Sequence, residues 1–146
     1  CFARHPGCPC GKPLQEVNDL IRLAETDRPS LCLNFSRQLF ATPHPEAAVD
    51  WFRDIALSAS GIGTIKCGIA LRDEDGGKDL KCVRVPTYII HGEKDLIVSP
   101  KLAEAQHEGI CGSKLITLPD SGHGIIYDQL GKFKSVFMDA ITDSAS

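Results

Sequence analysis

The chain has 146 residues, 42% of them hydrophobic and 24% charged, which suits one globular domain with a buried core. Its net charge of −3 offers no basic surface to nucleic acid or to an anionic membrane. No apolar run approaches the roughly 18 residues of a membrane span, and Arg4 is followed by no apolar signal segment. We therefore expect no nucleic-acid partner and no membrane association.

The first half of the chain predicts helices. Residues 1–13 are rich in Pro and Gly and are expected to form an irregular N-terminal segment. Apolar residues then recur with helical spacing over about 14–25, 28–40, 45–57 and 65–72. Asp27 and Pro29 are typical of a capped helix start. Residues 14–82 are therefore predicted to form a helical region.

The second half alternates between strands and helices. Residues 87–91 and 115–118 are short β-branched runs that predict strands. Helices are expected over about 100–108, with Ser99 as N-cap, and over about 128–141. A strand–helix–strand order implies a parallel pair with a right-handed crossover, which places residues 83–146 in the α/β class. Two such strands alone make an incomplete sheet.

The cysteine count of seven is odd, so the cysteines cannot all be paired internally. Four of them are isolated among apolar neighbours and are predicted to be buried free thiols, which fits a cytoplasmic location: Cys32, Cys67, Cys82 and Cys111. Cys1, His5, Cys8 and Cys10 form the pattern C-x3-H-x2-C-x-C, whose soft ligands could surround zinc. The pattern lacks the C-x2-C of common zinc modules, so we favour an irregular terminus and expect no metal.

Two ionisable residues follow the predicted strands. Asp95 lies a few residues after the first strand, and His123 lies between two glycines after the second. Each has an ordinary alternative, since Asp commonly stiffens a turn and a loop histidine is commonly only a surface residue. Ligand sites lie beyond the carboxyl ends of parallel strands, and the order acid then histidine is that of a nucleophilic triad. The pair therefore predicts a catalytic site.

The motifs around these residues resemble the C-terminal part of an α/β-hydrolase. They are V-P-T-Y-I-I-H-G-E-K-D at 85–95, L-A-E-A at 102–105 and K-L-I-T-L-P-D-S-G-H-G at 114–124. Residues 14–82 resemble the helical cap of that superfamily. Within them D-R-P-S-L at 27–31, W-F at 51–52 and S-G-I-G-T-I-K-C at 60–67 are similar to the arylesterase and cofactor-free haloperoxidase branch. The fold implied is a cap followed by the last two parallel strands and their helices.

The resemblance implies roles for several residues. Asp95 would be the triad acid, in preference to Glu93, and His123 the general base. His91, at the end of the first strand, is expected to be structural. Trp51, Phe35 and Ile97 are candidates for a pocket that binds a small ester, although aromatics at helical spacing more often belong to a core. The family implies no metal and no organic cofactor.

The nucleophile of such an enzyme is missing from the sequence. No Gly-x-Ser-x-Gly occurs, and neither Ser60 nor Ser121 has the setting of a nucleophile elbow. The chain begins with Cys1, not Met, and we expect roughly 120 further residues upstream, which would complete a typical single domain of this kind. The chain given is then expected to be inactive, and the parent protein to be an esterase that forms an acyl-enzyme.

Other interpretations remain open at this point. The same loops would serve a cofactor-free perhydrolase, or a dehalogenase with an Asp nucleophile. The chain could also be a non-catalytic interaction protein, or a complete protein that pairs with a separate chain carrying the nucleophile. Alone, it would expose the edge of the strand at 87–91 and should aggregate or be partly molten.

Overall fold

The computed structural model describes residues 2–6 and 9–144, and it divides into two compact units. One consists of Cys1–Gln38 and His44–Gly77 and is called the helical unit here. The other consists of Leu39–Pro43 and Lys78–Ser146 and is called the strand unit. The chain thus enters the strand unit briefly at Leu39–Pro43 before it returns to the helical unit.

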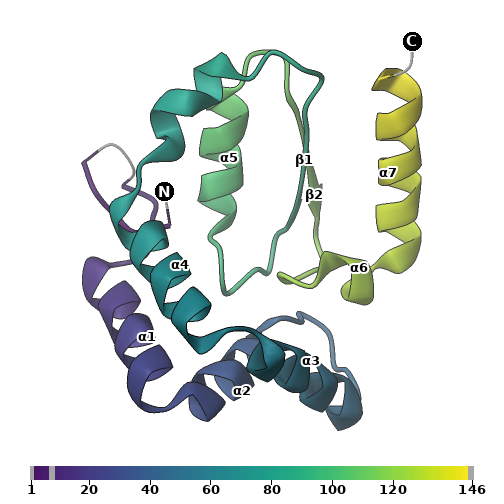
Figure 1. Ribbon diagram of the computed structural model, residues 1–146. Coiled ribbons are helices and arrows are strands. Elements are labelled where there is room, and N and C mark those ends of the chain that lie inside the picture. The colour runs from purple at the N-terminus through teal and green to yellow at the C-terminus, as the bar shows by residue number, and fades with distance from the viewer. Residues whose placement is uncertain (1, 7–8, 145–146) are drawn as a thin grey trace. The chain divides into compact units, whose positions relative to one another are not determined.

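The helical unit contains α1 (Leu14–Thr26), α2 (Arg28–Gln38), α3 (Glu46–Ser58) and α4 (Gly61–Asp73). Helix α1 packs against α4, and α2 packs against α3 (Figure 1). A small core forms where Ala3, Val17 and Ile21 are buried, with Phe2 and Ile65 packed against them.

Polar side chains fix the ends of these helices. The Asp27 carboxylate accepts a hydrogen bond from the Ser30 amide at 3.2 Å, as expected of a cap. Ser60 Oγ accepts one from the Gly63 amide at 3.1 Å, so α4 begins at Gly61, earlier than its apolar pattern predicted. The Arg28 guanidinium donates to the Leu57 carbonyl at 3.1 Å and to those of Ala56 and Ala59, which lie at the C-terminal end of α3.

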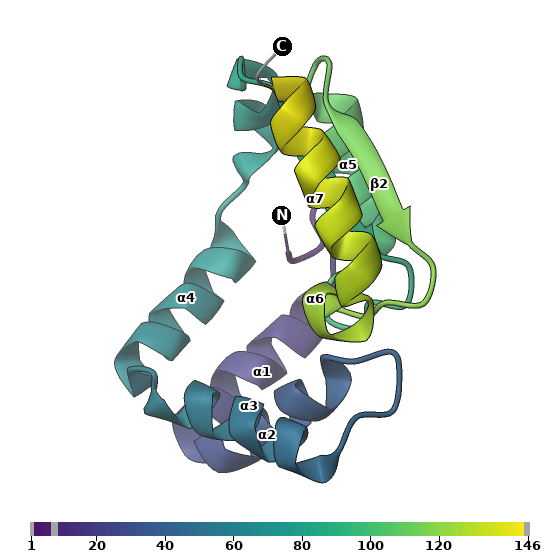
Figure 2. The same cartoon turned by 90° about the vertical axis from the view of Figure 1, so that its right-hand side faces the viewer.

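The strand unit follows the predicted order. Its elements are β1 (Tyr88–Gly92), α5 (Pro100–Gly109), β2 (Lys114–Leu118), α6 (Ile125–Asp128) and α7 (Leu130–Ser144). The two strands are parallel, with Tyr88 opposite Lys114 and Gly92 opposite Leu118. Helices α5 and α7 lie on opposite sides of the strand pair (Figures 1 and 2).

Much apolar surface of the strand unit is left uncovered. Parallel strands are normally buried on both faces, yet Tyr88–His91 are only half-buried and each strand has one neighbour in the described sheet. Among the α7 side chains that the structure describes, Ala140 is buried, whereas Phe137, Met138 and Ile141 are about half-exposed.

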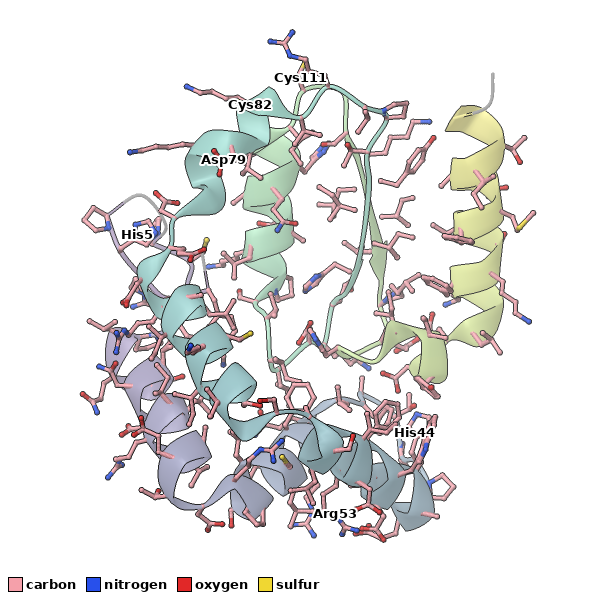
Figure 3. All side chains as sticks on the ribbon, viewed as in Figure 1. His5, His44, Arg53, Asp79, Cys82 and Cys111 are labelled. Atoms are coloured by element: carbon pink, nitrogen blue, oxygen red, sulfur yellow. The ribbon has the colours of Figure 1, made fainter. Side chains whose placement is uncertain are left out.

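Several local predictions need correction. Cys32 is buried, but Cys67, Cys82 and Cys111 are exposed. Figure 3 labels Cys82 and Cys111. Ser99 precedes α5 but its side chain makes no capping hydrogen bond. Two short helices were not predicted, namely the 3-10 helix η1 (Gly76–Cys82) and α6, which ends just before α7, the predicted final helix.

The length and apolar content of the helices test whether any of them could cross a membrane. No single described helix has the length and apolar content to cross a membrane; α3 and α4 would meet both criteria only as a joined pair, bent by 93°.

Candidate active site

The Asp95 carboxylate is built into the turn that follows β1. Its Oδ1 accepts hydrogen bonds from the backbone amides of Ile97 at 2.8 Å and Val98 at 2.9 Å. The Asp95 amide in turn donates to the Gly92 carbonyl at 3.2 Å. The turn-stiffening role of an Asp is therefore fulfilled by one oxygen, and the second oxygen, Oδ2, points elsewhere.

The loops after β1 and β2 lie close together, as the parallel order predicted. The Glu93 amide donates to the Leu118 carbonyl at 3.0 Å, and the Lys94 amide to the Ser121 carbonyl at 2.9 Å. A Cβ at Gly92 would lie 2.2 Å from the Gly122 carbonyl oxygen, so only glycine permits this approach.

This approach brings His123 to Asp95. His123 Nδ1 lies 2.8 Å from Asp95 Oδ2, at hydrogen-bond distance. The Asp95 side chain is 2% exposed and the His123 side chain 37% exposed. Because an ionised carboxylate only accepts, the contact places a proton on Nδ1. The buried acid thus orients a partly exposed imidazole.

The electrostatics of Asp95 favour its ionised form. Burial alone would raise the pKa of Asp95, but hydrogen bonds from His123, Val98 and Ile97 outweigh it and hold the pKa below its usual value. The carboxylate is therefore charged at neutral pH and can stabilise a positive charge on the His123 ring.

A second imidazole lies beside the same carboxylate. His91 Nε2 is 3.5 Å from Asp95 Oδ2 and 3.2 Å from the Val98 carbonyl oxygen. Both neighbours are acceptors, so Nε2 carries the proton here. The structural role expected for His91 is thus a specific one, because it ties the end of β1 to the turn that holds Asp95.

These groups line a small cleft in the strand unit, of about 220 Å³. Its wall includes His91, Asp95, Val98, Gln106, His123 and Ile125. An acid–histidine pair at the mouth of a cleft, beyond the ends of two parallel strands, is the arrangement expected of a catalytic site.

Known proteins resemble this chain in sequence and in fold. The AB hydrolase superfamily protein YisY of Bacillus subtilis (strain 168) is 39% identical over 135 residues, which are 92% of this chain and 50% of YisY. The esterase EaEST of Exiguobacterium antarcticum matches with a TM-score of 0.91 and 39% identity, over 97% of this chain and 53% of that one. In sequence and in fold, the chain matches the C-terminal half of proteins of the α/β-hydrolase superfamily.

Further comparisons agree with this assignment. A bromoperoxidase of Bacillus anthracis matches with a TM-score of 0.89 and 25% identity, over 97% of this chain and 54% of that one. No protein-family model matches the sequence. The chain spans about half the length of the relatives it matches, and it corresponds to the C-terminal half of the α/β-hydrolase fold.

The residues that line the cleft do not include Phe35, Trp51 or Ile97, the three residues predicted to bind substrate. Phe35 and Trp51 belong to the helical unit and are 40% and 53% exposed, and Trp51 packs edge-on against Phe52. Ile97 contributes its backbone amide to Asp95, while the neighbouring Val98 lines the cleft. A substrate contact by these three side chains stays a prediction.

The rival catalytic groups have other partners. Glu93 is exposed and accepts a hydrogen bond from Thr117 Oγ1 at 2.7 Å. The Ser121 side chain is fully buried, and Ser60 caps α4. Another serine, Ser113, lies 2.9 Å from His107 Nδ1, but it is buried and also donates to the His107 carbonyl, as a helix-ending contact does.

The cysteine cluster at the N-terminus falls partly outside the described residues. Cys1 and Cys8 are not among them, and His5 lies 3.7 Å from the Asp75 carboxylate. Within the residues that are described, no group of three or more His, Cys, Asp or Glu side chains is arranged to hold a metal ion.

Proposed function

We propose that this chain supplies the acid and the base of a serine-type carboxylic ester hydrolase. The observation that carries the proposal is the 2.8 Å contact between His123 Nδ1 and the buried Asp95 carboxylate. The likeness to an esterase at 39% identity supports an ester as the substrate class.

The proposed chemistry follows from the proton on Nδ1. His123 Nε2 takes the proton of a serine hydroxyl as its oxygen attacks the ester carbonyl carbon, and Asp95 stabilises the imidazolium that forms. The tetrahedral intermediate collapses to an acyl-enzyme when the alkoxide leaves with the proton from Nε2. Water then attacks the acyl carbon by the same route, which releases the acid and restores the hydroxyl.

The serine nucleophile is proposed to lie outside these 146 residues. Supporting this, the sequence has no Gly-x-Ser-x-Gly, and the chain spans about half of its relatives. The buried Ser121 hydroxyl is out of reach of any substrate. The uncovered apolar surface of the strand unit suits the remaining half of the fold, or a complementary chain, as its partner. The 146 residues alone would then not hydrolyse esters.

The helical unit is proposed to act as the cap over the substrate. Trp51 is the best candidate for a ring that contacts the acyl or aryl part of a small ester, with Phe35 and Ile97 as further candidates. Supporting this, Trp51 and Phe35 remain substantially exposed within their unit, where a core residue would be buried.

The test is the intact mass of the protein from its native source after treatment with a fluorophosphonate probe. We expect a species of roughly twice the mass of this chain that gains one adduct, because relatives are about twice as long and a serine nucleophile reacts once. His123→Ala should abolish labelling, whereas Glu93→Gln should not. A species at the mass of this chain with no adduct would contradict the proposal.

A further inference from the structure

Asp128 has more hydrogen-bond donors than any role in a short helix requires. Its Oδ2 accepts from the amides of Ala41 at 3.0 Å and Gly122 at 2.8 Å. Its Oδ1 accepts from the Thr42 amide at 3.1 Å and the Thr42 hydroxyl at 2.6 Å. Each carboxylate oxygen therefore accepts two hydrogen bonds, which uses its full capacity.

These donors come from two segments that are far apart in the sequence. Ala41 and Thr42 precede Asp128 by 87 and 86 residues and belong to Leu39–Pro43, the stretch that joins the strand unit between α2 and α3. Gly122 belongs to the loop that carries His123. Asp128 thus fastens the histidine loop to Leu39–Pro43.

Both glycines beside His123 are held against that stretch. Gly122 donates to Asp128, and the Gly124 amide donates to the Leu39 carbonyl at 2.7 Å. A Cβ at Gly122 would lie 2.8 Å from the Leu39 oxygen, so the two backbones are in direct contact. The Phe40 ring lies edge-on to Tyr127 with centroids 6.1 Å apart. The His123 backbone is therefore fixed on both sides.

The charge of Asp128 suits a carboxylate that holds the His123 loop by accepting hydrogen bonds. It does not suit a group that transfers protons. Burial would raise the pKa of Asp128, but hydrogen bonds from Ala41, Thr42 and Gly122 lower it to about 2. The carboxylate is ionised throughout the pH range in which histidine titrates, and its acceptor positions are filled.

We propose that Asp128 is a positioning residue for the Asp95–His123 pair, acting by clamping the His123 loop to Leu39–Thr42. The proposal rests on the proposed function, because it names what orients the proposed base. It predicts that loss of the clamp leaves the fold in place but disturbs the geometry of His123 at Asp95, and so lowers turnover more than substrate binding.

The test compares Asp128→Asn with Asp120→Asn in the protein as its own gene encodes it. Asn has nearly the size of Asp but replaces one acceptor oxygen with a donor. With its amide group at the Oδ2 site it loses the bonds from the Ala41 and Gly122 amides, and with that group at the Oδ1 site it loses the bond from the Thr42 amide, because the Thr42 hydroxyl can turn to accept. Asp120 is the matched control, because it is an exposed carboxylate on the loop that carries His123. It is paired with Lys94, on the loop after β1, at 3.1 Å.

Three readouts are needed. The first is amide hydrogen exchange at Ala41, Thr42 and Gly122, where at least one amide should exchange at least about tenfold faster in Asp128→Asn, because either orientation of the Asn loses a hydrogen bond that one of these amides donates to the charged carboxylate. The second is the far-downfield proton resonance of His123 Nδ1–H, assigned by its loss in Asp95→Asn, which should broaden or vanish. The third is hydrolysis of p-nitrophenyl acetate, where kcat should fall about tenfold with little change in KM.

The outcomes separate this proposal from the proposed function. Faster exchange with an unchanged His123 resonance and unchanged kcat would overturn the positioning role and leave Asp128 a structural residue. A wild-type protein with no esterase activity would contradict the proposed function, while the His123 resonance would still test the clamp. If Asp128→Asn does not fold, Thr42→Val removes the 2.6 Å hydroxyl contact to Asp128 and keeps the Thr42 amide, and an unaltered His123 resonance there would overturn the proposal.

Discussion

Replacing Asp95 by Asn tests the central contact most directly. The Asn Oδ1 can still accept from the Ile97 and Val98 amides, so the turn should survive. The amide group that replaces Oδ2 donates where the carboxylate accepted, and it faces His123 Nδ1 at 2.8 Å. The imidazole must then move its proton from Nδ1 to Nε2 or turn away, and either change removes the base.

The magnitude follows from these contacts. A wrong tautomer in an acid–histidine–serine arrangement lowers kcat by about ten-thousand-fold, which corresponds to about 5.4 kcal/mol of transition-state stabilisation at 1.36 kcal/mol per tenfold. The folded state loses one hydrogen bond to a charged group, and because the His123 side chain is 37% exposed, we expect a cost of only about 1.5 kcal/mol. Activity should therefore fall far more than stability.

The assays are p-nitrophenyl acetate hydrolysis and urea unfolding of the whole protein. Glu93→Gln is the matched control, because it makes the same carboxyl-to-amide change two residues away on an exposed side chain that is bonded to Thr117. It should retain activity within about twofold, as surface changes away from the reacting groups usually do. An Asp95→Asn variant within tenfold of the wild-type kcat, or an equal loss in Glu93→Gln, would refute the reasoning.

Four further predictions concern stability and can be checked by urea unfolding of the whole protein. Arg28→Ala should lower the free energy of unfolding by about 2 kcal/mol, because the guanidinium satisfies carbonyls at the end of α3; Arg28→Lys, which lacks the planar fork, should recover less than half of it. Ser121→Ala should raise the free energy of unfolding by about 1 kcal/mol, because the hydroxyl is buried and has no hydrogen-bond partner among the described residues. A lower free energy of unfolding in Ser121→Ala would show that the hydroxyl is hydrogen-bonded. His91→Leu should cost about 1–2 kcal/mol and His91→Gln less, since the Gln amide can still donate toward the Val98 carbonyl; equal losses would argue against that bond. Asp128 has a lowered pKa, so the stability that its ionised carboxylate contributes is present above the usual pKa of 3.8 and is lost as the pH falls toward about 2. Discounted for solvent screening, this contribution to the free energy of unfolding is about 1–2 kcal/mol. In Asp128→Asn the free energy of unfolding should fall less between about pH 4 and pH 2 than it does in the wild type.

The parts of the fold that sequence predicted well are those with local signals. Asp27 followed by Pro29 predicts a helix start from local capping alone, whatever the helix packs against. Two β-branched runs separated by one helix predict a pair of parallel strands. The meeting of Asp95 and His123 followed from the same rule, because carboxyl ends of neighbouring parallel strands lie at one edge of a sheet.

The parts that sequence missed depend on contacts between distant residues. Nothing near Asp128 distinguishes it from an ordinary loop carboxylate, because its partners Ala41 and Thr42 lie more than 80 residues earlier. Cys67 was predicted to be buried from its apolar neighbours, but a helix with apolar residues on every side does not reveal which face packs.

The path of the chain through Leu39–Pro43 has a consequence for engineering. The proposed cap role of the helical unit suggests exchanging its helices for those of a relative, and cuts at 13/14 and 82/83 would be the natural choice from sequence. Such a transplant would carry Leu39–Pro43 away with the helices and would take from Asp128 the donors of Ala41 and Thr42. A chimera that keeps Leu39–Pro43 from the recipient, and changes only the helices on either side, would leave the donors of Asp128 in place.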